Sequence, residues 1–227
     1  MEAFSLLVLV YTFQTSSKGL ENSVSDESST ELLRSAEAKQ RELFGVEKAS
    51  SHPHIEAWRD EFKNFGAKPS KFLCSVEALL SRTLKGQDIP TINRLVDLYN
   101  AVSVKHVLPI GGEDWDRLTS DLVLTLATGE EPFVTNQNGE PVTDYPSPNE
   151  VIWVDSSGVT CRRWNWRQCQ RTQLTVDTRN AYFVLDRLPP YSLDSLMVAG
   201  QELMDTLQQF SPNCTVSYEI LSADNLG

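Results

Sequence analysis

The side chains best suited to binding a ligand in this chain are concentrated in residues 159–185, which read VTCRRWNWRQCQRTQLTVDTRNAYFVL. Four arginines lie within ten residues, from Arg162 to Arg171, with two tryptophans between them, although the net charge of the protein is -11. The guanidinium fork of arginine suits carboxylate and phosphate groups, and aromatic planes suit nucleobases. The segment is therefore the first candidate for a binding site.

If a β-strand runs through this segment, its side chains alternate between two faces. One face then carries aromatic surface and the other carries guanidinium and amide donors. These two sets are Arg162, Trp164 and Trp166, and, opposite them, Arg163, Asn165 and Arg167. The alternative is a strand whose tryptophans lie in the core and whose arginines pair with local carboxylates. This alternative is slightly favoured for any single arginine, whereas the cluster as a whole favours a site.

A second group of polar residues lies on a predicted helix over residues 92–106. Three of its side chains are spaced by four and three residues and therefore form a ridge, which could line a pocket and bind an ammonium group. They are Asn93, Asp97 and Asn100. The alternative is a solvated helix face. His106 could polarise water, although a lone histidine at a helix end is more often a cap that interacts with the helix dipole.

Further candidates lie in loops and at strand ends. Gly111 and Gly112 are expected in a tight turn that permits close approach of a ligand, but no Walker lysine or GxGxxG pattern accompanies them. Glu113, Asp114 and Asp116 could supply a base, yet a solvated acidic loop is the preferred interpretation. Glu130 lies at the end of a predicted strand. The residues expected to close the same pocket, or else to form a turn, are Thr178, Arg179 and Asn180.

The length of 227 residues predicts a single domain over residues 1–227, with a flexible loop over 16–30 and a peripheral tail over 212–227. The net charge of -11 argues against general binding of nucleic acid, so no DNA partner is expected, but a local basic patch could contact an RNA end. No apolar run is long enough to span a membrane. The four cysteines and three histidines match no zinc spacing, so no metal or cofactor is expected, and reduced thiols indicate a cytoplasmic protein.

Hydrophobic periodicity predicts the elements that position these residues. One strand is followed by a run of helices, then by several strands and a closing helix. The strand at 181–186 places Phe183 and Leu185 on one face. The predicted strands cover residues 6–13, 122–127, 151–155, 159 onward, 181–186 and 216–221, and the helices begin at 30, 52, 70, 92 and 193. Such segregated runs indicate an α+β fold with a central mixed or antiparallel sheet flanked by helices.

Four stretches of the sequence resemble the freestanding B3/B4-domain proteins, which are relatives of the editing module in the β subunit of phenylalanyl-tRNA synthetase. They read NRLVDLYNAVSVKHVLPIGGED, GEEPF, CRRWNWRQ and DTRNAYFVLD, and the resemblance runs from about residue 6 to residue 210. It implies a cleft that recognises an aminoacyl-tRNA end or a free amino acid, and hydrolysis of a wrongly formed ester. No domain for aminoacylation or anticodon binding is present, so synthetase activity is not implied.

Hydrolysis of an activated ester requires mainly that the protein holds the 3′ adenosine, the amino acid and a water molecule. The first hypothesis is therefore a deacylase that acts in trans on mischarged tRNA, with Asn100, His106 and Glu130 as candidate catalytic residues. The second is a non-catalytic module that binds RNA or a free amino acid, and the third is an interaction domain with structural arginines. The editing hypothesis depends on whether the helix ridge and the arginine segment face one cavity.

Overall fold

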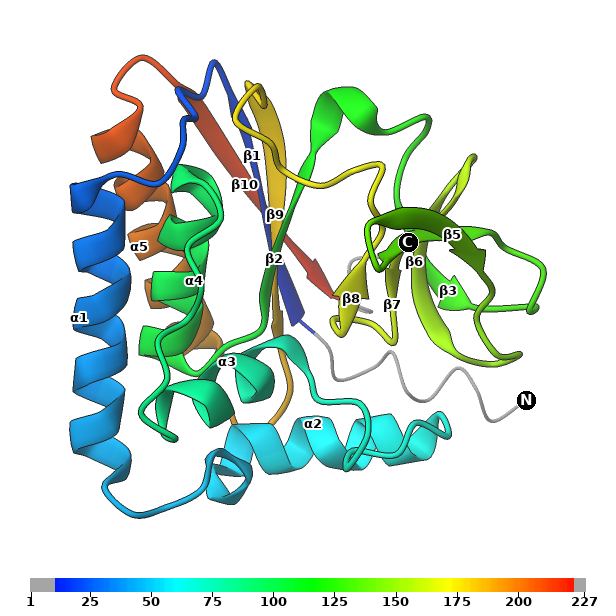
Figure 1. Ribbon diagram of the computed structural model, residues 1–227, viewed down its shortest axis with the longest axis horizontal. Helices are drawn as coiled ribbons and strands as arrows, with labels where there is room; N and C mark the ends of the chain where they lie inside the picture. Colours follow the sequence, from blue (N-terminus) through cyan, green and yellow to red (C-terminus); the bar gives the residue numbers. More distant parts are fainter. Residues whose placement is uncertain (1–10, 223–227) are drawn as a thin grey trace.

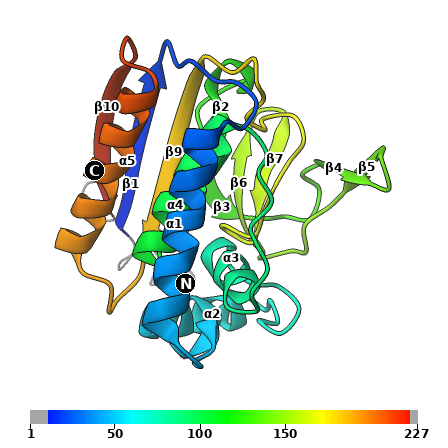
Figure 2. The same ribbon diagram turned by 60° about the vertical axis from the view of Figure 1, so that its left-hand side comes forward.

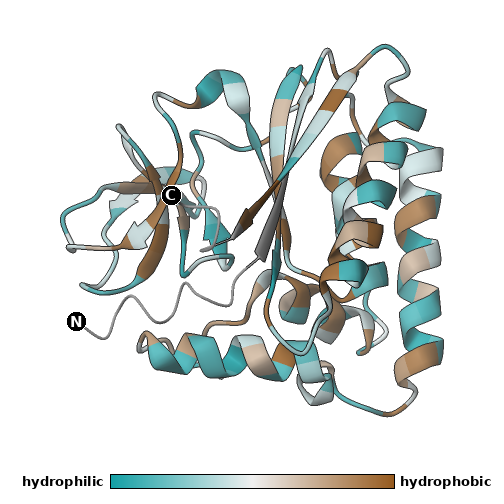
Figure 3. Ribbon diagram, turned by 180° about the vertical axis from the view of Figure 1, so that it is seen from behind, coloured by the Kyte–Doolittle hydropathy of each residue, from teal (hydrophilic) through white to brown (hydrophobic). Residues whose placement is uncertain are grey.

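The structure of the protein is a computed structural model that describes residues 11–222, and it has the α+β fold that the sequence predicts (Figure 1). Within the described residues there are five α-helices. They are α1 (Glu27–Phe44), α2 (Pro53–Asn64), α3 (Ser75–Thr83), α4 (Arg94–His106) and α5 (Leu193–Phe210). Figure 3 shows hydrophilic and hydrophobic residues on the same helices, as expected of amphipathic helices that cover a core. None of the helices in the described range is long and apolar enough to cross a membrane.

The strands form two four-stranded sheets and a separate hairpin, and all of their pairings are antiparallel. The first sheet has the order β10-β1-β9-β2 and consists of β1 (Tyr11–Lys18), β2 (Ile110–Asp114), β9 (Asn180–Arg187) and β10 (Thr215–Ser222). The second has the order β3-β6-β7-β8 and consists of β3 (Val123–Leu126), β6 (Val151–Asp155), β7 (Gly158–Arg162) and β8 (Arg167–Gln168). The hairpin pairs β4 (Phe133–Gln137) with β5 (Glu140–Asp144).

The two sheets lie on either side of the space that contains the candidate site. Helices α1, α4 and α5 cover one side of the first sheet, and the second sheet lies on the other side, next to β2 and β9 (Figure 1). Helices α2 and α3 lie across the base of both sheets, and the β4–β5 hairpin projects away from the body (Figure 2). This arrangement brings the middle of the chain, α3 to β2, next to β7 and β8.

The two faces of β9 have different neighbours, because side chains alternate along a strand. Ala181, Phe183 and Leu185 pack with residues of α4 and α5 in one hydrophobic core. Tyr182, Val184 and their neighbour Asp186 point to the other side, toward the second sheet. The predicted placement of Phe183 and Leu185 on one face is therefore confirmed.

The loop predicted for residues 16–30 is wrong at both ends. Ser16–Lys18 belong to β1, where pairing with both β9 and β10 stabilises an extended backbone despite the polar sequence. At the other end, Asp26 caps α1 in a capping box with Ser29, so the helix begins at Glu27 rather than near residue 30. Residues 6–10 of the predicted first strand lie outside the described residues. The predicted last strand is confirmed as β10.

The paired glycines are in a strand and not in the tight turn that the sequence suggested. Gly111 and Gly112 pair with Val184 and Phe183 across β2 and β9. A Cβ atom at Gly112 would lie 2.6 Å from Cδ1 of Phe183, so the absence of a side chain is needed for packing. At Gly111 the nearest such atom is Nε2 of Gln168 at 3.4 Å, which is an ordinary contact.

We expect Gly112→Ala to lower the free energy of unfolding by about 1–3 kcal/mol, because the buried ring of Phe183 has no room to move. Gly111→Ala is the matched control and should change it by less than about 1 kcal/mol. Urea unfolding of both variants measures the difference. Equal effects of the two substitutions would contradict this packing role of Gly112.

Candidate functional site

A cavity of about 270 Å³ lies where α3, α4, the β2–β9 pair and the second sheet meet. Its wall on the first sheet is made mainly by residues of β2 and β9 on the face away from the helices, with Ile110 of the helix-facing side at its edge. The lining residues are Ser75, Ala78, Leu79, Tyr99, Asn100, Ile110, Gly111, Glu113, Trp153, Cys161, Trp164, Asn165, Trp166, Arg167, Gln168, Tyr182, Val184 and Asp186. The amide of Gln168 donates a hydrogen bond of 2.8 Å to the carbonyl oxygen of Gly112 and so connects the two sheets beside the cavity.

The arginine–tryptophan segment is a strand, a turn and a short strand, and not the continuous strand that the sequence suggested. Strand β7 ends at Arg162, and Arg163 and Trp164 have left-handed φ angles of 47° and 65°. The backbone N–H of Trp166 donates to the carbonyl of Arg162, which closes the turn. The predicted alternation of Arg162, Trp164 and Trp166 on one face is therefore wrong, because a turn breaks the two-residue period.

Two of the four clustered arginines are structural. Arg162 is 4% exposed and contacts Glu150 through Nε at 2.7 Å and through Nη2 at 2.8 Å. Its remaining nitrogen, Nη1, pairs with Asp144 at the end of the β4–β5 hairpin. Arg171 makes a two-point contact with Asp155, at 2.6 and 2.8 Å. For these two residues, the alternative in which arginines pair with nearby carboxylates is the one that the structure supports.

Arg163 is also held inside the protein and does not line the cavity. Its guanidinium lies 3.7 Å from the ring centroid of Phe72 and 4.6 Å from that of Trp166, and Nη2 is 3.1 Å from Glu150. Burial lowers the pKa of Arg163 below its usual value. The contacts place Arg163 behind Trp166, where it supports the ring as a positioning residue.

Arg167 differs from the other three arginines. It is exposed, lines the cavity and lies 5.1 Å from the ring centroid of Trp166. Within residues 11–222 no carboxylate forms a salt bridge with it. Its charge is therefore available to a ligand at the cavity.

Four side chains around the turn have buried polar atoms without a hydrogen-bond partner in the described part of the chain. The atoms are both amide atoms of Asn165, Nη1 of Arg163, Nε1 of Trp164 and Oγ of Ser75. The turn is joined to helix α3 because the N–H of Ser75 donates to the carbonyl of Asn165, at 3.1 Å. Trp164 is only 2% exposed, and its ring packs edge-on against Trp58 at 5.2 Å between centroids. Buried polar groups without partners are costly, so a bound ligand or water would stabilise this wall.

Glu113 is a buried group of the cavity and not part of the solvated acidic loop that the sequence suggested. It lies on β2 opposite Tyr182, and its side chain shares the inward face of that pair. Only 3% of the residue is exposed, and Oε2 has no hydrogen-bond partner among residues 11–222. Burial raises the pKa of Glu113 to about 7. Hydrogen bonds from nearby hydroxyl groups, of which that of Thr172 is the largest, and the charge of Arg171 act in the opposite direction.

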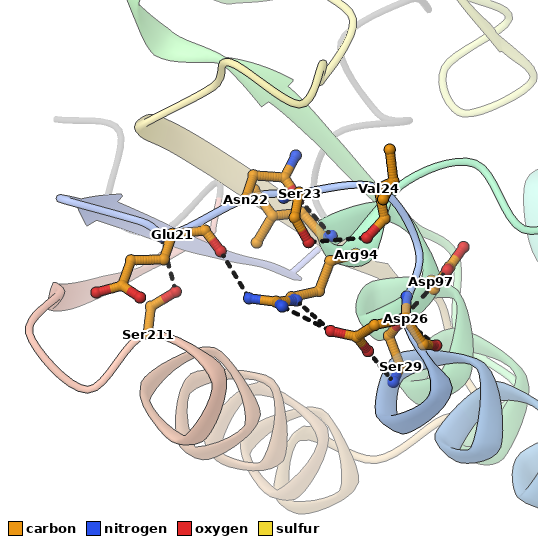
Figure 4. A network of polar contacts seen from close by, with 10 residues as sticks. Glu21, Asn22, Ser23, Val24, Asp26, Ser29, Arg94, Asp97 and Ser211 are labelled. Carbon is orange, nitrogen blue, oxygen red and sulfur yellow. Dashed lines mark hydrogen bonds and ion pairs between the residues drawn. The ribbon is translucent and has the colours of Figure 1, made fainter.

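The polar ridge of α4 is divided between structure and site. Asn93 is the N-cap of the helix: its Oδ1 accepts from Val96 N at 3.1 Å, and its Nδ2 donates to Leu174 O at 3.0 Å. Asp97 accepts from the N–H of Ile92 and belongs to a network with Ser29 at the start of α1 (Figure 4). Only Asn100 lines the cavity. The ridge prediction is therefore wrong for Asn93 and Asp97, because the first binds the loop at Leu174 and the second binds the start of α1.

The other proposed residues lie away from this cavity. His106 contacts Glu202 at 2.8 Å and borders a separate, more open hollow of about 640 Å³ between the ends of α1, α4 and α5. Glu130 is exposed in the β3–β4 connection. Thr178 donates to Asp114, Arg179 to its neighbouring carbonyls and Asn180 to Asp116, so these three residues organise the start of β9.

The reactive groups in the cavity are carboxyl and amide groups rather than an activated nucleophile. Cys161 lines the cavity, but burial raises its pKa well above the usual value, so it is a neutral thiol. Sequence reasoning did not identify Ser75, Tyr182 or Asp186. The alternation along β9 contained a signal for the last two, because they face away from Phe183, whereas no local pattern marks Ser75.

Comparisons with known proteins identify one family. A model of the B3/4 domain matches residues 57–196, which is more than half of the chain. A search of curated proteins finds no match. Among solved structures that match is an N-terminal fragment of the phenylalanyl-tRNA synthetase β subunit from Pyrococcus horikoshii, with 15% identity and a TM-score of 0.41. The match covers 54% of this chain and 41% of that one, so the chain spans less than half the length of that fragment.

Proposed function

Because this chain belongs to the B3/4-domain family, we propose that its cavity binds the aminoacyl end of a mischarged tRNA and hydrolyses the aminoacyl ester in trans. Every residue that lines the cavity lies within the matched range 57–196. The observation that carries the proposal is the group of unpartnered polar side chains around this one cavity, as judged over residues 11–222. A ligand that satisfies these groups gains their hydrogen bonds without first breaking others.

The cavity offers separate contacts for the two ends of an aminoacyl group. The ammonium group can be bound by oxygen atoms of Asn100 and Asp186. The ester carbonyl can accept hydrogen bonds from Nδ2 of Asn165 and Nε1 of Trp164, which have no other acceptor within the described residues. Donors that are fixed before the reaction stabilise the negative charge that develops on this oxygen when water attacks. The aromatic ring of Trp166 borders the cavity and suits a nucleobase of the tRNA end.

Glu113 is the group best placed to activate the water. Its carboxylate takes a proton as the water oxygen bonds to the carbonyl carbon, and it returns that proton to the ribose oxygen when the ester C–O bond breaks. The products are a free amino acid and a tRNA with a free terminal hydroxyl. A general base acts best with a pKa near the working pH, and the pKa of Glu113 is about 7. This role replaces the ones first considered for His106 and Glu130.

We expect Asn165→Ala to lower the rate of amino acid release from mischarged tRNA by about 10²-fold or more, because it removes a donor to the carbonyl oxygen. Asn100→Ala should mainly raise KM, because it removes a contact to the ammonium group. The measurement is a deacylation screen over tRNAs that carry labelled non-cognate amino acids. Asn213→Ala is the matched control, because this asparagine is exposed, lies just before β10 and does not line the cavity.

Two results would contradict the proposal. Release at the same rate by Asn165→Ala and the parent protein would mean that the cavity is not the site of hydrolysis. Thermal stabilisation by aminoacyl-tRNA without release of amino acid would instead indicate a non-catalytic binding module.

A further inference from the structure

The hollow of about 640 Å³ that His106 borders lies outside the cavity between the sheets. It is found where α1 and α4 end and α5 begins, and Figure 2 shows these helix ends at the same end of the fold. No residue that lines this hollow also lines the first cavity. A ligand bound here is therefore separate from the proposed site of hydrolysis.

The sides of this hollow carry aliphatic side chains that the fold leaves uncovered. Leu43 of α1 and Val198 of α5 line it and are 66% and 60% exposed. The exposed aliphatic residues continue along the chain on either side of the lining, because Val46 precedes Glu47 and Leu193 precedes Asp194. Exposed apolar groups that gather in one place with a polar rim mark an interaction site more often than single ones do.

The charged side chains that line the hollow leave it acidic. Lys105 and His106 both contact the carboxylate of Glu202, at 2.6 and 2.8 Å, so this carboxylate offsets their charge. Glu47 and Asp194 also line the hollow, and neither forms a salt bridge within residues 11–222. The ends of α1 and α4 add to this potential, because the C-terminus of a helix carries a partial negative charge.

We propose that this hollow is a docking site for a basic amphipathic segment of a partner protein. Its apolar side chains pack against Leu43 and Val198, and its lysine or arginine side chains meet Glu47 and Asp194. Charge decides among the occupants that an exposed apolar hollow could take. A second copy of this chain with its net charge of -11, a nucleic acid and an anionic lipid surface each bring negative charge to an acidic rim. A basic segment with apolar anchors matches both features of the hollow.

The test uses the full chain and a fluorescent synthetic peptide that has leucine at every third or fourth position and lysine between. Two further peptides carry glutamate in place of lysine, or the same residues in scrambled order. Fluorescence anisotropy should show that the scrambled peptide binds the parent protein about tenfold more weakly than the lysine peptide, because it lacks an apolar face. Val198→Ser should weaken binding of the lysine peptide about fivefold or more, because an apolar contact at the centre of the site is lost.

The double variant Glu47→Lys/Asp194→Lys should weaken binding of the lysine peptide about tenfold or more and strengthen binding of the glutamate peptide, because the charge of the rim is reversed. The matched control is Glu130→Lys/Glu140→Lys, which makes the same change of charge at exposed positions elsewhere. Val123→Ser is the control for Val198→Ser, because Val123 is a 53% exposed aliphatic residue of β3.

Four results would overturn the inference. They are no binding of the lysine peptide, equal binding of the scrambled peptide, equal effects of the hollow variants and their controls, and self-association of the parent that Val198→Ser abolishes. The last result would identify a second copy of the chain as the occupant. Val198→Ser should leave the release of amino acid from mischarged tRNA unchanged, so failure of the docking site and failure of the proposed function are distinguishable.

Discussion

Replacing Glu113 with glutamine is expected to slow ester hydrolysis by about 10²–10⁴-fold and, at the same time, to make the protein more stable at pH 8. The catalytic loss follows from the role of the carboxylate as a base, since removal of a positioned base costs about 10²–10⁴-fold in rate. The stability gain follows from burial. The carboxyl lies on the inward face of β2, and burial raises its pKa from 4.5 to about 7.

The sign of the pH effect follows from where the proton is bound. Below pH 4.5 the carboxyl of Glu113 is protonated in both the folded and the unfolded chain, so the raised pKa has no consequence. Between pH 4.5 and about 7 the unfolded chain loses this proton while the folded protein retains it, so stability falls as the pH rises. Above pH 7 the loss is complete, and a shift of this size corresponds to about 3 kcal/mol.

Urea unfolding at pH 5 and pH 8 measures this effect in the parent protein and in Glu113→Gln. The parent should lose stability between the two pH values, and the variant should lose less by about 2–3 kcal/mol. Glu130→Gln is the matched control, because the carboxyl of Glu130 is exposed and away from the cavity. An unchanged pH dependence in Glu113→Gln would show that this carboxyl is not buried in solution, and full hydrolytic activity would remove it from the mechanism.

The largest loss of stability is expected for Glu150→Ala. Glu150 is 3% exposed and contacts two buried guanidiniums, with Arg162 at 2.7 and 2.8 Å and Arg163 at 3.1 Å. Its removal leaves Arg163 without a carboxylate partner among the described residues, and it leaves Arg162 with Asp144 alone. Loss of one member of a buried ion pair costs about 3–5 kcal/mol, mainly because of the charge that remains.

The same measurement separates the structural arginines from the available one. Arg167→Ala should change the free energy of unfolding by less than about 0.5 kcal/mol, because Arg167 is exposed and forms no salt bridge among the described residues. Glu140→Gln is the control for Glu150, because it removes the charge of an exposed carboxyl at the start of β5. A loss below about 1 kcal/mol in Glu150→Ala would mean that the arginine pair is solvated, and it would restore Arg162 as a candidate ligand contact.

The sequence also indicated which segment would border the site, but it predicted the conformation of that segment and the roles of its arginines only in part. It placed Trp164, Asn165, Trp166 and Arg167 at a binding site, and all four line the cavity. It could not show that Arg162 is paired while Arg167 is available to a ligand. That distinction depends on Glu150, which precedes β6 and binds Arg162. A continuous strand was a reasonable expectation, since nothing local predicts two consecutive non-glycine residues with positive φ angles.

The sequence by itself determined the fold class, the amphipathic helices, the alternation along β9 and the membership suggested by its characteristic stretches. These features follow from local periodicity, which is set by 3.6 residues per turn in a helix and by two residues in a strand. Tertiary structure decided which polar side chains are free. Asn93, Asp97 and Asn100 belong to the same predicted ridge of one helix. Asn93 caps α4 and donates to Leu174, Asp97 accepts from Ser29, and of the three only Asn100 lines the cavity. Their partners lie far away in the chain, and only folding brings those partners close enough to satisfy one side chain and leave another for a ligand.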